Sequence, residues 1–95
     1  MKISELLSGP EKWTQGAWAR NQKGETVSAF DSSACCWCIS GAIAKCYPAD
    51  QFTRICDQIL RHLDYHLEEG SIFRWNDHLD RKFEEVKLVV ETLAL

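Results

Sequence analysis

Two adjacent cysteines, Cys35 and Cys36, are the residues whose chemistry stands out first. We expect both in the first turn of a helix, where the helix dipole stabilises a thiolate and lowers its pKa. In a thiol enzyme or a thiol-based sensor, Cys36 would be the reactive group, with His66 as its base and Asp77 orienting that base. The same supporting roles are open to His62, His78 and Asn76. We favour the competing interpretation, in which these cysteines are buried and serve as small hydrophobic side chains.

A second candidate is a metal site at His62 and His66. The two residues lie four apart, which is the spacing of a histidine pair that binds zinc from one helix, and Cys56 is expected on the same face. However, no Cys-x-x-Cys pair is matched by a second one. We therefore favour partly buried histidines at the edge of the core, and we expect neither a bound metal nor a cofactor.

The third candidate is the run Trp75-Asn76-Asp77, whose polar groups could surround an aromatic floor and bind a small ligand. Asn and Asp are also common turn formers and helix caps. We favour the structural interpretation, in which Asp77 or Asp80 caps the last helix, although one corner of the fold could serve both purposes.

Composition restricts the class of protein. The chain has 95 residues, enough for one domain, and is 45% hydrophobic and 26% charged, which is typical of a soluble globular protein. Residues 1–49 carry five basic and four acidic side chains, whereas residues 50–95 carry six basic and ten acidic ones. Without a basic stripe a nucleic-acid role is not expected, and without a long apolar run neither a membrane span nor a secretion signal is expected. Five cysteines, an odd number, indicate reduced thiols and predict a cytoplasmic location.

The elements that must position these residues are organised around the segment 34–47. Apart from Ser40 and Lys45 this segment is apolar or small, so it predicts a central helix buried on nearly every side and ended by Pro48. Gly41 and Ala42 would let neighbouring backbones approach it closely.

The remaining elements are expected on either side of this helix. We predict a short opening helix at residues 3–7, a hairpin with its turn at 21–24, a long helix over 50–69, a connector at 71–78 and a last helix from 79 or 80 to 94. Trp18 and Phe30 of the hairpin should pack on the central helix. The fold class is therefore α+β and mostly helical, with a central buried helix packed by two or three further helices and a short N-terminal β-hairpin.

A family resemblance rests on a set of spaced motifs. These are Trp13-Thr-Gln-Gly-Ala, Trp37-Cys38 followed by Gly41-Ala42, and Trp75-Asn76-Asp77 with Arg81 and Val86 downstream. The pattern resembles a family of small bacterial proteins, domain of unknown function 6197, over roughly residues 12–90. Lys12 and Lys82 depart from it, since the family usually has Gly and Thr there. The resemblance implies a compact common fold and no particular activity.

Taken together, the sequence favours a binding or regulatory interaction module over an enzyme. Its partner would be another protein or a second copy of the chain, and Leu88 with the end 93–95 is one surface that could contact it. The alternative is a small cysteine-dependent enzyme or thiol-based sensor that works through Cys36.

Overall fold

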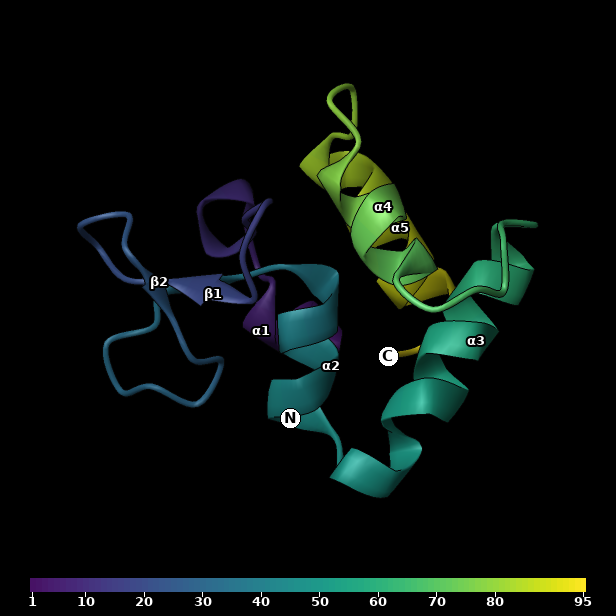
Figure 1. Cartoon of the computed structure of the whole chain (residues 1–95), viewed down its shortest axis with the longest axis horizontal. Helices are drawn as coiled ribbons and strands as arrows, with labels where there is room; N and C mark the ends of the chain where they lie inside the picture. Colours follow the sequence, from purple (N-terminus) through teal and green to yellow (C-terminus); the bar gives the residue numbers. More distant parts are fainter.

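The computed structural model describes residues 1–95, and it confirms the predicted α+β, mostly helical fold class. In chain order the elements are α1 (Ile3–Leu6), the 3-10 turn η1 (Pro10–Lys12), β1 (Ala19–Arg20), β2 (Thr26–Val27), β3 (Cys36–Trp37), α2 (Ile39–Cys46), the 3-10 turn η2 (Ala49–Gln51), α3 (Phe52–His62), α4 (Ser71–Asp77) and α5 (Phe83–Thr92). Figure 1 shows the hairpin of β1 and β2 projecting to one side, opposite α3, α4 and α5. None of these helices combines the length and the apolar character that crossing a membrane requires.

The hairpin forms where the sequence predicts it. β1 pairs antiparallel with β2, with Ala19 opposite Val27, and Gly24 closes the turn at φ 79°. A backbone at this positive φ costs a glycine little, whereas a side chain would strain it. The turn residue therefore fixes the register of the two strands.

The start of the predicted central helix is wrong, because residues 36–37 form strand β3. This strand pairs antiparallel with the other edge of β1, so the sheet order is β2-β1-β3. The backbone N–H of Cys35 donates to the carbonyl of Arg20 at 2.9 Å, and that of Cys38 donates to the carbonyl of Trp18 at 3.1 Å. Helix formation here would leave the carbonyls of Trp18 and Arg20 without those partners, and polar backbone groups are rarely left unpaired in a fold.

Helix α2 therefore begins later than predicted, at Ile39, and Cys38 is its N-cap. The Cys38 sulfur accepts a hydrogen bond from the backbone N–H of Gly41 at 3.2 Å, so a thiol takes the place of the usual hydroxyl or carboxylate cap. The predicted burial is confirmed for the first five residues of α2, whereas residues 44–46 are half-buried or exposed. Residues 39–43 are all buried, and α2 contacts α1, α3, α4 and β3.

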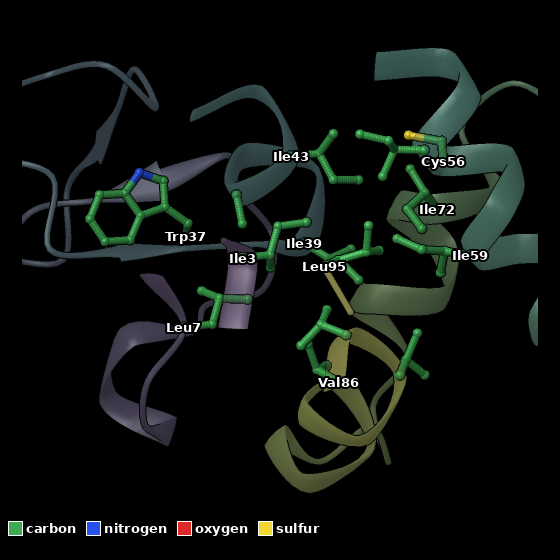
Figure 2. Packing of buried hydrophobic residues seen from close by; sticks show 14 of the residues in the cluster. Ile3, Leu7, Trp37, Ile39, Ile43, Cys56, Ile59, Ile72, Val86 and Leu95 are labelled. Carbon is green, nitrogen blue, oxygen red and sulfur yellow. The ribbon is translucent and has the colours of Figure 1, made fainter. Parts of the chain in front are cut away.

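The core lies around α2 and draws on both ends of the chain. A cluster of 19 buried hydrophobic residues fills it, and Figure 2 shows part of this cluster. Ile39 and Ile43 of α2 are completely buried, as are Ile3 of α1 and Val86 of α5. Leu95 is also buried, which corrects its prediction as part of a contact surface. Leu88 points outward as predicted and is 66% exposed.

The long helix predicted over residues 50–69 is wrong at its C-terminal end, because α3 stops at His62. Asp64 takes a left-handed conformation at φ 52°, its N–H bonds to the carbonyl of Arg61, and the N–H of Tyr65 bonds to the carbonyl of Leu60. These two bonds form a Schellman motif that satisfies the free carbonyls of the helix end. Gly70, which directly precedes α4, takes no part in ending α3.

The segment expected as a connector forms helix α4, and α5 begins at Phe83. Neither Asp77 nor Asp80 caps α5. Instead the Glu85 carboxylate accepts from the backbone N–H of Lys82 at 2.9 Å, which also lowers the Glu85 pKa, together with a hydrogen bond from Arg81. The cap therefore comes from inside the helix, in the manner of half a capping box.

Candidate functional site

Asn76 is the centre of a polar network at the start of α2. Its side chain is completely buried, and its Oδ1 accepts from the Trp13 indole at 2.8 Å and from the Ile39 N–H at 3.0 Å. Its Nδ2 donates to the Thr14 carbonyl at 3.1 Å and to the Asp77 carboxylate at 2.9 Å. A side-chain amide offers two donor hydrogens and an oxygen with two lone pairs, so its hydrogen bonding is complete. Asn76 thus joins the segment after α1 to the end of α4.

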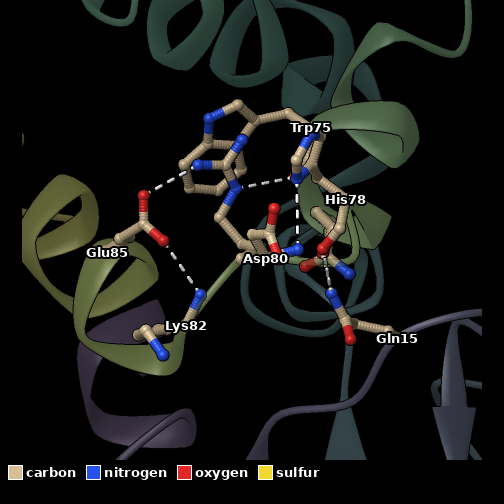
Figure 3. A network of polar contacts seen from close by, with 8 residues as sticks. Gln15, Trp75, His78, Asp80, Lys82 and Glu85 are labelled. Carbon is tan, nitrogen blue, oxygen red and sulfur yellow. Dashed lines mark hydrogen bonds and ion pairs between the residues drawn. The ribbon is translucent and has the colours of Figure 1, made fainter.

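Neighbouring residues extend this junction. Gln15 donates from Nε2 to the backbone carbonyls of Asn76 and His78 at 2.8 and 2.9 Å, and Figure 3 shows its contact with His78. The Asp77 carboxylate accepts from the Gly16 N–H at 3.0 Å. The Asp77 carboxylate that was expected to cap α5 therefore binds the N-terminal segment instead.

Trp75 is buried beneath Arg81. The guanidinium lies 4.1 Å from the centre of the indole ring, within range of a cation–π interaction, and its Nε donates to the Trp75 carbonyl at 2.9 Å. Arg81 also pairs with Glu85 at 2.8 Å. The three residues 75–77 are thus engaged in contacts within the fold. A ligand role for them stays a prediction.

The reactive-thiol hypothesis placed Cys35 and Cys36 in the first turn of a helix, and this placement is wrong. Cys36 lies on β3, so no helix dipole lowers its pKa. Burial instead raises the pKa of its thiol, and the neighbouring Cys35 adds to this effect. Both thiols donate to the carbonyl oxygen of Arg20, at 3.5 and 3.7 Å. No histidine is hydrogen-bonded to a cysteine, and the proposed partners His66 and Asp77 make other contacts.

Two further cysteines are buried. Burial raises the pKa of Cys38 and of Cys56 from 9.0 to about 11. A thiol with such a pKa is protonated near neutral pH and reacts slowly, because the thiolate is the nucleophile. The predicted burial of Cys38 is confirmed.

The histidine pair does not lie on one helix, because α3 ends at His62. Both His62 and His66 are exposed rather than at the edge of the core, and His66 packs edge-on against the Tyr65 ring at 5.2 Å. No group of three or more His, Cys, Asp or Glu side chains is placed to hold a metal ion. The helical basis of the predicted pair is therefore wrong.

An exposed aromatic surface around Trp18 was not predicted from the sequence. Its ring stacks on Phe52 of α3 at 5.8 Å and meets Phe73 of α4 edge-on at 5.0 Å, yet it remains 40% exposed. Beside it lies a groove of about 590 Å³, which we call the hairpin groove. The groove is lined by Trp18, Phe30, the segment 44–49, Phe52 and Thr53. Phe30 is 65% exposed, with Lys45 5.9 Å from its ring centre.

This placement corrects the prediction that both hairpin aromatics pack on the central helix. The backbone of Trp18 does contact α2, because its carbonyl oxygen lies where a Cβ of Gly41 would be. Its side chain, however, reaches α3 and α4, and Phe30 stays at the surface. The turn at residues 21–24 predicted the hairpin, but the direction in which its side chains point depends on how the hairpin packs against the helices.

These features define a small, mostly helical α+β protein with a buried amide junction and an exposed aromatic groove. Its sequence matches the model of a family of unknown function, DUF6197, over residues 2–94, and the chain belongs to that family. The match confirms the family resemblance seen in the sequence. No curated protein and no solved structure shows a significant match to the chain.

Proposed function

We propose that this protein is a binding module that recognises a segment of a partner protein through the hairpin groove. The observation that carries the proposal is that Trp18 and Phe30 are both exposed and both line one hollow. Large aromatic side chains are enriched among the residues that dominate protein interfaces, and contiguous exposed apolar surface is characteristic of interaction sites.

The walls of the groove are suited to this role. Trp18 is held by ring contacts with Phe52 and Phe73, and its backbone carbonyl accepts from the N–H of Cys38. A side chain already held in place loses little rotamer freedom when a partner binds, which favours affinity. The five free cysteines are consistent with a reducing compartment, and we propose the cytoplasm as the place where binding occurs.

The alternative, a cysteine-dependent enzyme or thiol-based sensor that uses Cys36, is less well supported. Its thiol is half-buried, its pKa is raised, and its hydrogen bond is to a backbone carbonyl rather than to a histidine. Competitive alkylation of the folded protein tests this alternative directly. Labelling of Cys36 far faster than the other four thiols would favour it.

Selection of binders from a displayed library of random peptides tests the proposed function. We expect selected peptides to bind the wild-type protein in calorimetry and to lose most of their affinity with Trp18→Ala and with Phe30→Ala. Phe30→Ala is the safer variant for folding, since that side chain is mostly exposed. Leu88→Ala, on an exposed site of α5, is the matched control and should bind normally.

Two results would reject the proposal. One is the absence of any peptide whose binding depends on Trp18 or Phe30. The other is a Trp18-dependent dimer in sedimentation analysis, which would assign the groove to a second copy of the chain.

A further inference from the structure

A second hollow is also lined by Trp18, and we call it the acidic cleft. It has a volume of about 490 Å³ and is bounded by α3, the segment 67–70 and the start of α4. Phe52 and Phe73 contribute to its walls together with Trp18, so the same indole borders both hollows. An occupant of the hairpin groove would therefore lie next to the acidic cleft.

All the charged side chains that line the acidic cleft are negative. Three carboxylates line it, from Asp57, Glu68 and Glu69, and no lysine or arginine does. Glu68 is partly neutralised by Arg74 at 3.5 Å, in a pair that is open to solvent. Asp57 and Glu69 have no ion-pair partner.

Aromatic rings beside unpaired carboxylates favour a particular ligand chemistry. The face of an indole or phenyl ring attracts a cation, and a nearby carboxylate adds charge attraction and a hydrogen-bond acceptor. An anion would be repelled, and a neutral apolar group would leave the carboxylates without a charged partner. The protein already contains this arrangement elsewhere, where Arg81 lies over Trp75 and pairs with Glu85.

We infer that the acidic cleft binds a lysine or arginine side chain of the same partner segment that occupies the hairpin groove. The inference rests on the proposed function and specifies the partner: a segment with an apolar or aromatic residue for the groove and a basic residue for the cleft. Leu67, 49% exposed at the rim of the cleft, would cover the aliphatic part of the basic side chain.

The peptides selected above provide the test. We expect them to be enriched in lysine or arginine next to an apolar residue, and their affinity to fall as salt rises. The double variant Asp57→Asn and Glu69→Gln should weaken binding about tenfold and reduce the salt dependence, because it removes two charges without removing side-chain volume. Glu84→Gln removes a charge at an exposed position of α5 and is the control, with affinity unchanged.

The outcomes separate this inference from the proposed function. Peptides that depend on Trp18 but carry no basic residue, or that bind the double variant as well as the wild type, would overturn the inference and leave the proposed function standing. If no selected peptide binds the wild-type protein in a Trp18-dependent manner, both the inference and the proposed function are rejected. Spermidine serves as the free-cation probe, and its displacement of a selected peptide at equal concentration would assign the cleft to a small polycation instead of a protein side chain.

Discussion

The Oδ1 atom of Asn76 accepts a 2.8 Å hydrogen bond from the indole Nε1 of Trp13, which lies 63 residues earlier in the chain. Replacement of Asn76 by Ala removes the partner of the buried Ile39 N–H and of two partly buried groups, the Trp13 indole and the Thr14 carbonyl. We expect the free energy of unfolding to fall by about 3–5 kcal/mol, because each unpaired buried group carries its full desolvation cost. Urea denaturation measures this loss.

Asn21 is the matched control, since its hydrogen bonds lie within the hairpin turn. Asn21→Ala should cost only about 1 kcal/mol. Asn76→Asp keeps the acceptor but places a carboxylate against the Thr14 carbonyl and the Asp77 carboxylate. Its penalty should shrink from pH 7 to pH 5, because burial among acceptors favours the protonated form. Equal losses for the two alanine variants would contradict the central role of Asn76.

The second prediction concerns the contact between α2 and β1 at Gly41. A Cβ at this position would overlap the Trp18 carbonyl oxygen, which also accepts the Cys38 N–H. Gly41→Ala should therefore force α2 away from the sheet and cost about 3 kcal/mol. Gly24→Ala is the comparison: no atom lies within 4 Å of its new Cβ, and only the positive φ is strained, at a cost of about 1 kcal/mol. Thermal unfolding that ranks Gly24→Ala as the more damaging change would refute the close contact.

The third prediction concerns alkaline pH. The pKa of Cys38 and of Cys56 is about 11 in the folded protein and near 9.0 when the thiol is free. Above pH 9 the unfolded chain loses these protons first, so the free energy of unfolding should fall between pH 9 and about 11. The fall should be smaller in Cys38→Ala and in Cys56→Ala. The same slope in these variants and in the wild type would show that the two thiols are not responsible.

The fourth prediction concerns the end of α5, where Ala94 takes a left-handed conformation at φ 56°. Its N–H and that of Leu95 bond to the carbonyls of Glu91 and Val90, in the same motif that ends α3. Ala94→Gly relieves the strain on the side chain and should raise the unfolding midpoint by about 2–5 °C. Ala44→Gly, the same substitution inside α2, should lower the midpoint, because glycine costs about 1 kcal/mol in a helix. A drop for Ala94→Gly would show that the site does not hold this conformation.

Much of the fold could be predicted because the determining signals are local. A nearly continuous apolar segment predicted most of the central helix, the sequence also predicted the last helix, and Gly24 marked the hairpin turn. The wrong predictions concern residues whose conformation depends on more than their local sequence. Residues 36–37 join the sheet because β1 offers them a free edge. The end of α3 at His62 was missed because Asp64, just after it, takes the left-handed conformation that glycine normally signals.

The candidate site was less predictable for the same reason. The sequence drew attention to Asn76 and Asp77 because of their polarity, and the fold uses both to hold the N-terminal segment. Trp18 looked like an ordinary core residue. Its exposure depends on how β1, α3 and α4 meet, and no spacing within a single element reports that arrangement.

Trp18, which lines both hollows, also has an optical consequence. Among the four tryptophans, Trp37 and Trp75 are buried and Trp13 is half-buried, so Trp18 is the indole most open to water. Indole fluorescence shifts to longer wavelength in water and is quenched by dissolved acrylamide where the ring is accessible. The long-wavelength, quenchable part of the emission should come mainly from Trp18. The unlabelled protein can therefore report, through its own fluorescence, when something covers the surface around this ring.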